Sequence, residues 1–381
     1  DAPAIRFKGF SDAWEQRKFE EIAVRSSVIC SDDTLPRVEY EDIVSGTGRL
    51  NKDIYAKQSI KSGIAFHQGD VLYGKLRPYL QNWLLPTFDG LAVGDFWVLQ
   101  PQNADSSFLY RLIQSRQFDE VANQSTGTKM PRADWKLVSK TVFSIPSNIS
   151  EQAAIGTYFT ALDSLITLHQ RKFEKLKNVK KSMLEKMFPQ NGSSYPEIRF
   201  KGFTDPWEQR KLTEFVEFFS GLTYTPNDVQ ENGTLVLRSS NVSNGEVVDA
   251  DNIYVNPQVV NSENVKVGDI VVVVRNGSRS LIGKHAQIKA FMPNTVIGAF
   301  MTGIRSECPE FTNALLNTSR FEEEIAMNMG ATINQITGYM FSKMEFKVPC
   351  LDEQKKIGEY FEKLDNLITL HQRELEKLQN I

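Results

Sequence analysis

The sequence predicts an α+β protein: two globular α/β domains separated by two long helices that pair as an antiparallel coiled coil, with a pseudo-twofold internal repeat. Three observations predict this fold class. An opening segment occurs twice, a long heptad-patterned segment occurs twice, and the mixed segments between them share a plan but little identity. Self-similarity at a long period is typical of a duplicated architecture.

The opening segment stands at residues 5–19 and again at residues 198–212. The copies read IRFKGFSDAWEQRKF and IRFKGFTDPWEQRKL, so 12 of 15 positions are identical at an offset of 193. We expect each copy to begin one half of the chain.

The closing segment, at residues 151–179 and 353–381, is identical at 19 of 29 positions. Its apolar residues recur at spacings of three and four, which is the heptad pattern of a coiled coil. Because a helix this charged cannot bury its apolar stripe alone, we expect the two stripes to pack against each other. The predicted seam consists of Phe159, Leu162, Ile166, His169, Phe173, Leu176, Phe361, Leu364, Ile368, His371, Leu375 and Leu378.

Proline and capping signals set the predicted boundaries. Each long helix follows an Ile-Pro or Val-Pro dipeptide, and Ser150 and Asp352 are the expected N-caps. The expected segments are a first domain at 1–146, a spacer helix with its linker at 147–190, a second domain at 191–349 and a C-terminal spacer helix at 350–381. Because the last helix stops in the middle of a heptad at Ile381, we expect the natural chain to continue.

The middle of each half reads as mixed β-structure with some helix. A Gly-Asp turn leads into an apolar strand at 69–76 and again at 268–275. The spacing of apolar residues predicts one amphipathic helix at 108–123 and its counterpart at 310–328. A glycine-containing loop follows each of these helices.

Composition excludes several classes of protein. The chain has 381 residues, 41% of them hydrophobic and 24% charged, as in ordinary globular domains. No apolar stretch reaches the roughly 18 residues of a membrane span. Three scattered cysteines favour a reducing compartment, so we expect a cytoplasmic protein. A nucleic-acid binder working alone is usually basic, whereas the net charge here is −3, so cations must be local or supplied by a partner.

No catalytic motif is present in the sequence. It lacks the H-E-x-x-H, P-loop, G-x-S-x-G and G-x-G-x-x-G patterns, and also the Asn/Asp-Pro-Pro-Tyr/Phe tetrapeptide with which amino-methyltransferases hold the target amine. His169 and His371 occupy matched seam positions and are interpreted as packed seam residues, with a metal or pH site as the alternative. We therefore expect neither catalysis nor a metal site.

Local basic loops indicate nucleic-acid binding. Residues 270–306 contain no Asp or Glu but include Arg275 and Arg279, and residues 54–88 contain a single acid. Arg binds guanine edges or phosphate, and Asn pairs with adenine edges. A solvated basic surface is the alternative for any one loop, but two loops at equivalent places favour binding. The polar loop at 237–245 is either a further contact, through Arg238 and Asn241, or a hairpin end.

These motifs together resemble the specificity subunit of type I restriction–modification enzymes. The resemblance rests on the duplicated RFKGF-x-D-x-W-E-Q-R-K openings, the GD turn-strands, the G-T-x-M-P and G-A-T-I-N loops, and the duplicated EQ-x-x-IG-x-Y-F-x-x-L-D-x-L-I-T-L-H-Q-R helices. It covers essentially the whole chain. The openings and helices are specific in combination, whereas the middle segments match only in plan.

The resemblance implies that the domains are target-recognition domains, each reading one half of a bipartite double-stranded DNA site. The helices would set the spacing and dock two modification subunits, which would bind S-adenosylmethionine, flip an adenine out and methylate its N6. Two restriction subunits using ATP and Mg would complete the complex. This chain would hold no cofactor, catalyse nothing and touch no membrane.

By position, the resemblance carries the DNA-reading role to one set of loop residues in each domain. The first set is Lys75, Arg77, Tyr79, Thr128, Lys129 and Arg132, and the second is Arg275, Asn276, Ser278, Arg279, Thr332 and Asn334. Two rival functions are an enzyme that fuses recognition and catalysis, and a scaffold that holds partners without reading DNA. The missing catalytic motifs disfavour the first, and the acid-poor basic loops disfavour the second.

Overall fold

The computed structural model describes residues 3–56, 59–124, 130–329 and 334–380. The chain divides into two units, unit 1 at Asp1–Thr167 and unit 2 at Leu168–Ile381, and the division falls inside helix α5 (Ile149–Met187). The four-segment division that the sequence suggests remains a prediction. None of the described helices combines the length and apolar character that crossing a bilayer requires.

Unit 1 contains two four-stranded sheets and two short ribbons. The first sheet has the order β2 (Ala23–Ser26), β11 (Phe96–Pro101), β8 (Val71–Gly74) and β9 (Trp83–Leu84). The second has the order β3 (Ile29–Cys30), β7 (Gly63–Phe66), β10 (Gly90–Ala92) and β4 (Arg37–Val38). The ribbons pair β1 (Trp14–Lys18) with β12 (Val142–Pro146), and β5 (Ile43–Val44) with β6 (Arg49–Leu50).

Short helices cover one face of the first sheet of unit 1. They are α1 (Phe19–Ile22), α2 (Ser106–Leu112), α3 (Arg116–Ala122) and α4 (Trp135–Lys140). Because strand side chains alternate between faces, Val71 and Tyr73 of β8 pack in the helix-side core, whereas Leu72 packs in the core shared with the second sheet. Unit 1 therefore has three layers, helices on a sheet on a second sheet.

Unit 2 contains the same set of sheets and ribbons. Its first sheet has the order β14 (Val216–Ser220), β23 (Met301–Ser306), β20 (Ile270–Val273) and β21 (His285–Gln287). Its second has the order β15 (Val229–Gln230), β19 (Ile253–Val255), β16 (Thr234–Leu237) and β22 (Thr295–Ile297). The ribbons pair β13 (Glu208–Lys211) with β24 (Glu345–Val348), and β17 (Val242–Ser243) with β18 (Glu246–Val247).

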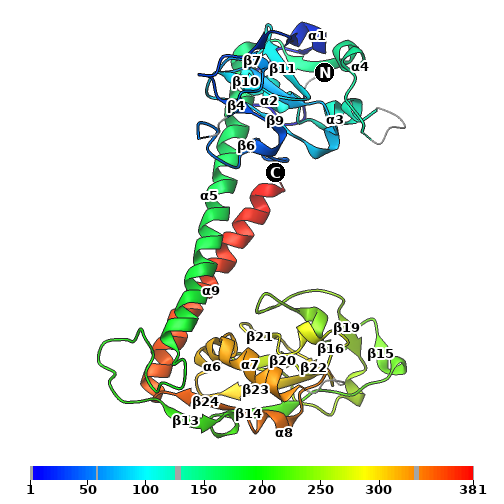
Figure 1. The fold of residues 1–381 in the computed structure, drawn as a ribbon. Helices are drawn as coiled ribbons and strands as arrows, with labels where there is room; N and C mark the ends of the chain where they lie inside the picture. Colours follow the sequence, from blue (N-terminus) through cyan, green and yellow to red (C-terminus); the bar gives the residue numbers. More distant parts are fainter. Residues whose placement is uncertain (1–2, 57–58, 125–129, 330–333, 381) are drawn as a thin grey trace. The chain divides into compact units, whose positions relative to one another are not determined.

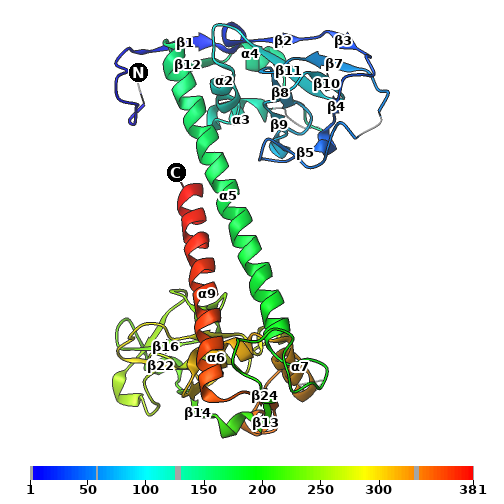
Figure 2. The ribbon, with the colours of Figure 1, turned by 90° about the vertical axis from the view of Figure 1, so that its left-hand side faces the viewer.

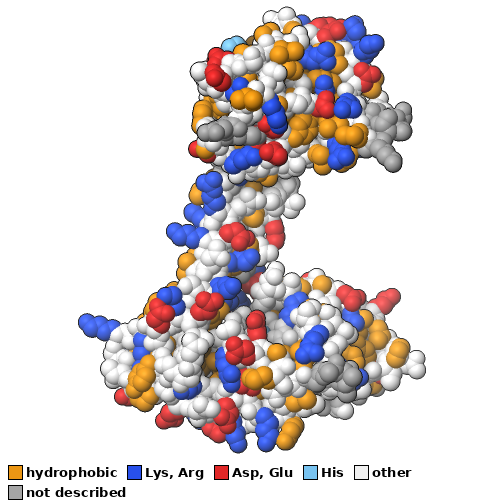
Figure 3. Space-filling view, viewed as in Figure 1, with side chains coloured by type: hydrophobic (Ala, Val, Ile, Leu, Met, Phe, Trp, Pro, Cys, Tyr) orange, Lys and Arg blue, Asp and Glu red, His pale blue; other side chains and the backbone are white. Residues whose placement is uncertain are grey.

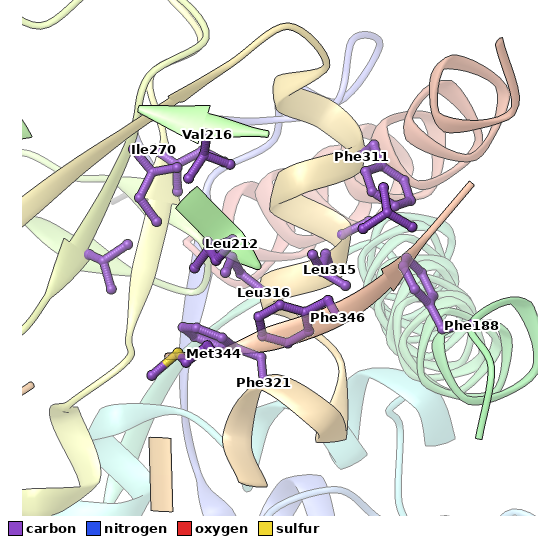
Figure 4. Packing of buried hydrophobic residues seen from close by; sticks show 14 of the residues in the cluster. Phe188, Leu212, Val216, Ile270, Phe311, Leu315, Leu316, Phe321, Met344 and Phe346 are labelled. Carbon is purple, nitrogen blue, oxygen red and sulfur yellow. The ribbon is translucent and has the colours of Figure 1, made fainter. Parts of the chain in front are cut away.

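Helices α6 (Pro309–Leu316) and α7 (Ser319–Asn328) pack on one face of the first sheet of unit 2 (Figure 1), and α8 (Gly338–Phe341) precedes β24. The apolar run of β20 is buried on both faces, with Ile270 and Val272 in the helix-side core and Val271 and Val273 in the other. The helix-side core continues into the long helices (Figure 4), where Phe188 stacks on Phe311 with ring centroids 5.7 Å apart.

The two units share the first sheet and differ in the second. The strand order β2-β11-β8-β9 corresponds to β14-β23-β20-β21, and both sheets pair antiparallel throughout. Each second sheet contains one parallel pair, β4 with β10 and β16 with β22. The third strand of the sheet is β7 in unit 1, where it pairs with β10, and β19 in unit 2, where it pairs with β16. The third strand therefore lies on opposite sides of the parallel pair in the two units. The low identity of the middle segments therefore accompanies a real difference in topology.

The predicted Gly-Asp turn-strands are confirmed. Gly69 and Gly268 take positive φ angles of 92° and 95°, which a residue without Cβ adopts readily. The buried carboxylates of Asp70 and Asp269 accept hydrogen bonds from backbone N–H groups three residues earlier, at 2.9 and 2.8 Å. The dipeptide therefore closes a tight turn before the buried strand in both units.

The prediction of one amphipathic helix at 108–123 and one at 310–328 is wrong in detail, because each segment forms two helices. The hydroxyl oxygen of Ser115 accepts a hydrogen bond from the N–H of Phe118 and starts α3, and Thr318 does the same for Phe321 in α7. Apolar periodicity continues across both breaks, so a hydroxyl cap is the only local sign of the break.

The predicted N-caps Ser150 and Asp352 are also wrong. Helix α5 starts at Ile149, and the side-chain oxygen of Asn148 accepts the N–H of Ser150. Helix α9 (Leu351–Gln379) starts one residue before Asp352. Both predicted caps therefore lie in the first turn. The following Glu-Gln dipeptide, which the repeat duplicates, makes the contacts that fix these helix starts.

Matched ion pairs join the duplicated openings to the duplicated helices. Arg6 contacts Glu151 through two hydrogen bonds of 2.6 Å, and Arg199 contacts Glu353 through two of 2.8 Å. Both glutamates are 1% exposed. The Arg6 guanidinium lowers the pKa of Glu151 against the opposing effect of burial. In each unit, the repeated opening segment and the repeated helix start therefore contact each other through this ion pair.

The glutamine of each dipeptide makes a second repeated contact. Its side-chain amide donates to the carbonyl of the proline that precedes the helix, from Gln152 to Pro146 at 2.8 Å and from Gln354 to Pro349 at 2.9 Å. These bonds satisfy buried polar groups at the strand-to-helix corner of each unit.

Within unit 2, α9 runs antiparallel to the part of α5 that follows Thr167 (Figure 2). Lys180 pairs with Asp365 at 2.6 Å, whereas His169, earlier in α5, meets His371, later in α9. Of the predicted seam residues in this unit, Phe361 and Leu364 are buried in the core and Leu176 packs against it. The seam residues Phe159, Leu162 and Ile166 belong to unit 1, and their packing against α9 remains a prediction.

One buried histidine predicts a loss of stability in acid. Burial lowers the pKa of His285, because a protonated ring in the core is poorly solvated. The neutral ring is fully bonded: Nδ1 lies 3.0 Å from the carbonyl oxygen of Gly283, and the side-chain amide of Asn317 donates to Nε2 at 3.1 Å. Unfolded histidine has a pKa of about 6.5. Since the folded pKa is lower, the stability that the neutral ring contributes is fully present above the unfolded pKa and is lost as the pH falls below the unfolded pKa.

We therefore expect the urea midpoint of the wild-type protein to decrease when the pH is lowered from 7.5 to 5. The decrease should be smaller in the variant His285→Gln. The control is His67→Gln, because the exposed His67 lies beside Asp89 and its pKa is raised, so its linkage has the opposite sign. An unchanged pH dependence in His285→Gln would contradict the assignment.

Candidate nucleic-acid interface

In unit 1, the two loops predicted to contact nucleic acid lie side by side. The chain leaves β8 at Gly74, and Leu76 forms an antiparallel bridge with Arg132. The N–H of Arg77 donates to the carbonyl of Pro131 at 2.7 Å, and that of Ala133 donates to the carbonyl of Lys75 at 2.8 Å. Residues 75–81 and 130–133 therefore form one surface, which we call loop surface 1.

A single carboxylate orients two cations of loop surface 1. Asp95 lies 3.5 Å from the Lys75 amine and 3.1 Å from the Arg132 guanidinium. Partial burial raises the pKa of Asp95, but Arg132 and Lys75 outweigh it and lower the pKa overall. Tyr40, whose pKa is raised by burial, donates to the Asp95 carbonyl at 2.7 Å and accepts the N–H of Leu76 at 2.8 Å. The surface keeps a local positive excess in a fixed orientation.

The tip of loop surface 1 is exposed. Arg77 takes a left-handed conformation with φ of 50° and is solvent-exposed, as is Tyr79 at 57%. The Arg77 side chain forms no ion pair with any other described residue. Both side chains are free to meet a ligand. The predicted contacts Thr128 and Lys129 lie outside the described residues.

Unit 2 is built in the same way. The chain leaves β20 at Val273, and Arg275 forms an antiparallel bridge with Gln335. The N–H of Ile336 donates to the carbonyl of Val274 at 2.8 Å. Residues 275–281 and 334–336 therefore form the counterpart, loop surface 2. The predicted contact Thr332 lies outside the described residues.

Two predicted polar contacts of loop surface 2, Asn276 and Asn334, use their side chains to hold the loop itself. Asn276 donates to the Ser239 hydroxyl at 3.0 Å and accepts the N–H of Ser278 at 2.9 Å. Asn334 donates to the carbonyl of Gly277 at 3.0 Å. These side chains stabilise the loop, and each keeps only part of its hydrogen-bonding capacity for a ligand.

The arginines of loop surface 2 are the groups best placed for an anion or a base. Arg275 lies over the ring of Phe300, 5.1 Å from its centroid, and Phe300 is 57% exposed. Arg279 begins a short 3-10 helix (Arg279–Leu281) and is exposed. Neither arginine forms an ion pair within the described residues. The contact with the ring orients Arg275 without neutralising it.

Asp95 and Phe300 occupy corresponding places. Each offers its backbone carbonyl to the residue that leaves the central strand, Lys75 at 2.9 Å in unit 1 and Val274 at 3.0 Å in unit 2. The Phe300 carbonyl also accepts the N–H of Arg275 at 3.2 Å. A carboxylate orients the cations of one surface, and an aromatic ring orients the arginine of the other. The same backbone frame therefore presents different side chains in the two units.

The predicted contacts Arg238 and Asn241 need correction. Asn241 is fully buried, and its side-chain amide donates to the carbonyl of Ala250 and the side chain of Asn252, both at 2.8 Å. Asn241 is therefore not available to contact a nucleic acid. Arg238 donates to the backbone and carboxylate oxygens of Asp251 at 2.6 Å. The segment is a hairpin-like loop closed by its own polar groups, which is the alternative that the sequence left open.

Sequence reasoning missed two residues that orient the cations of these surfaces, Asp95 and Phe300. A signal existed for Phe300, since it is an aromatic residue in an acid-free segment. On the faces visible in Figure 3, basic and acidic side chains are interspersed on both units. The visible faces are therefore not uniformly basic.

Comparison with protein families identifies the chain. The model described as the type I restriction modification DNA specificity domain matches twice, at residues 29–178 and 204–380. The chain belongs to this family. As a type I specificity protein, it carries two DNA specificity domains, which agrees with the two loop surfaces on matched frames.

One relative of this chain matches most of its length, and another matches less than half of it. The type I restriction enzyme MjaVIII specificity subunit of Methanocaldococcus jannaschii is 26% identical over 327 residues, 78% of this chain and 76% of the relative. The EcoKI specificity subunit of Escherichia coli K12 is 28% identical over 172 residues, 42% of this chain and 36% of the relative.

Solved structures share the fold. The S subunit of the type I system of M. genitalium has a TM-score of 0.65 at 14% identity, covering 98% of this chain and 95% of its own. A chain from a study of complex assembly and conformational transition of the type I R-M system has a TM-score of 0.52 at 17% identity, covering 97% and 95%. The predicted fold class, two α/β domains with long helices, is confirmed.

Proposed function

We propose that the chain reads a two-part DNA site, with loop surface 1 contacting one half and loop surface 2 the other. One observation carries the proposal: both units join the loop after the central strand to the loop before α4 or α8 by a β-bridge, and they place different side chains on that frame. Arg contacts with guanine or phosphate would supply affinity and part of the specificity.

We also propose the assembly. Two modification subunits would dock on the long helices and methylate adenine N6, and two restriction subunits would join them. S-adenosylmethionine, ATP and Mg would bind to those partners, so this chain would contribute recognition and no catalysis. Its three cysteines are unpaired, which supports work in the cytoplasm, where thiols stay reduced.

A methylome tests the proposal. The chain is expressed with its methyltransferase subunit in a host without methylation, and N6-methyladenine is mapped by single-molecule sequencing. We expect a two-part motif with a fixed gap and one methylated adenine on each strand. Replacing residues 19–141 by those of another specificity subunit keeps β12 and the ion pair between Arg6 and Glu151, and should change one half of the motif only.

The matched control replaces residues 212–344, which should change the other half only. If the subunits associate but no new methylation appears, the chain is a scaffold and the proposal fails. If either replacement changes both halves, the assignment of one half-site to each unit fails.

A further inference from the structure

Two histidines and a glutamate converge where α5 meets α9 in unit 2. Nδ1 of His169 lies 3.2 Å from Nδ1 of His371 and 3.1 Å from Oε2 of Glu374, and the last two atoms are 3.5 Å apart. Within the part of the chain that the structure describes, this is the one group of three His, Cys, Asp or Glu residues whose ligand atoms all lie within 4.8 Å of one another.

Hydrogen bonding alone serves this arrangement poorly. Each Nδ1 carries either one lone pair or one proton, and the ionised carboxylate only accepts. A proton on one imidazole nitrogen makes a hydrogen bond to only one of the other two atoms at a time. The third atom then faces a lone pair without a proton between them. A cation at the centre is bonded by all three atoms at once.

The separations match those of ligands on a tetrahedral ion. Zinc binds imidazole nitrogen and carboxylate oxygen at about 2.0–2.2 Å, so two ligands on a tetrahedral ion lie roughly 3.3–3.6 Å apart. The three observed separations, 3.1 to 3.5 Å, fall close to this range. An ion therefore fits between the ligand atoms with shifts of only a few tenths of an ångström.

The sequence repeat explains how the site is assembled. His169 and His371 are equivalent positions of the two closing segments, and the antiparallel packing brings these equivalent residues face to face. Glu374 stands three residues after His371, so both project from the same face of α9. The corresponding residue of α5 is Lys172, so the group contains one carboxylate and two imidazoles.

The site is sheltered but open on one side. The side chains of His169 and His371 are 18% and 16% exposed, whereas that of Glu374 is 41% exposed. The imidazoles are held between the helices, and the carboxylate borders solvent. Three protein ligands with an accessible fourth position is the arrangement in which zinc keeps a bound water.

We propose that His169, His371 and Glu374 bind one divalent transition-metal ion of the zinc type and clamp α9 to α5. Two imidazoles and one carboxylate suit Zn²⁺ and Co²⁺, whereas Mg²⁺ and Ca²⁺ favour oxygen ligands. This replaces the expectation, drawn from sequence, that these histidines only pack. Because the ligands come from two helices, binding stabilises the register of α9 against α5.

The test uses the untagged full chain, freed of metal by a chelator. Addition of Co²⁺ should give one bound ion per chain with the visible ligand-field bands of tetrahedral coordination, and Zn²⁺ should displace it. Each of the variants His169→Gln, His371→Gln and Glu374→Gln should bind at least about tenfold more weakly. Zn²⁺ should raise the thermal midpoint of the wild type but not of these variants.

Two matched variants control for chance binding. Glu376→Gln removes an exposed carboxylate from α9 close to the site, and His67→Gln removes an exposed histidine of unit 1. Both should keep wild-type affinity. Glu374→Gln retains both histidines, so it remains informative if a histidine variant fails to fold. The proposal is overturned if the wild type binds no ion, or if the three ligand variants bind as tightly as it does.

Discussion

Replacing Arg275 and Arg279 together by alanine should abolish reading of one DNA half-site in the assembled complex. Both side chains are exposed on loop surface 2, and neither is neutralised by an ion pair within the described residues. A good bidentate contact to a base provides about 1–3 kcal/mol of discrimination. We therefore expect the double variant to lose at least about tenfold in affinity for its methylome-derived site.

The measurement is fluorescence anisotropy of the complex on that DNA, at several salt concentrations. Each lost phosphate contact should reduce the slope of log affinity against log salt by about 1. A loss of affinity with an unchanged slope would instead assign the arginines to bases. The two readouts therefore distinguish positioning contacts from reading contacts.

The control removes the same charge elsewhere in unit 2. Lys201 and Lys211 are exposed residues of the second opening segment and lie outside loop surface 2. Lys201→Ala plus Lys211→Ala should leave affinity within about twofold, because neither residue belongs to the loops that we expect to contact DNA. If the control loses as much affinity as the arginine pair, the loop surface is not the reading surface.

The architecture was predictable because its signals are local and repeated. Heptad spacing marks a helix whatever it packs against, and the GD turn-strands depend on a glycine and a carboxylate that act within three residues. The pairing of each strand loop with the loop before α4 or α8 was not predicted, because the sequence showed only that the two middle segments share an order of elements. The bridges Leu76 with Arg132 and Arg275 with Gln335 join residues more than 50 positions apart, which no local pattern encodes.

The errors arose where a polar side chain had two possible roles. Asn241 carries the side-chain amide of a base-contacting residue, yet this amide closes the loop that contains it. Ser115 sits within an apolar period but ends one helix and caps the next. In both cases the competing local hydrogen bond decided the outcome, and short polar side chains are known to make such bonds.

The second large effect concerns the ion pair between Arg199 and Glu353. Glu353→Ala should lower the free energy of unfolding of unit 2 by about 3 kcal/mol, because removal of one partner leaves a charge uncompensated in a buried place. Glu353 is 1% exposed and Arg199 15%, so water cannot readily replace the lost partner. Because Arg199 is still partly in contact with water, we expect the effect to lie at the low end of the range for buried pairs.

Urea unfolding followed by tryptophan fluorescence measures this effect, because Trp207 belongs to the same opening segment as Arg199 and lies in the core of unit 2. Glu362→Ala, which removes an exposed carboxylate from the same helix, should change stability by less than about 0.5 kcal/mol. Arg199→Met with Glu353→Leu removes both charges and should recover most of the loss, since an apolar pair of similar volume needs no solvation. If the double variant is as unstable as Glu353→Ala, the pair acts through geometry at the helix start and not through a compensated charge.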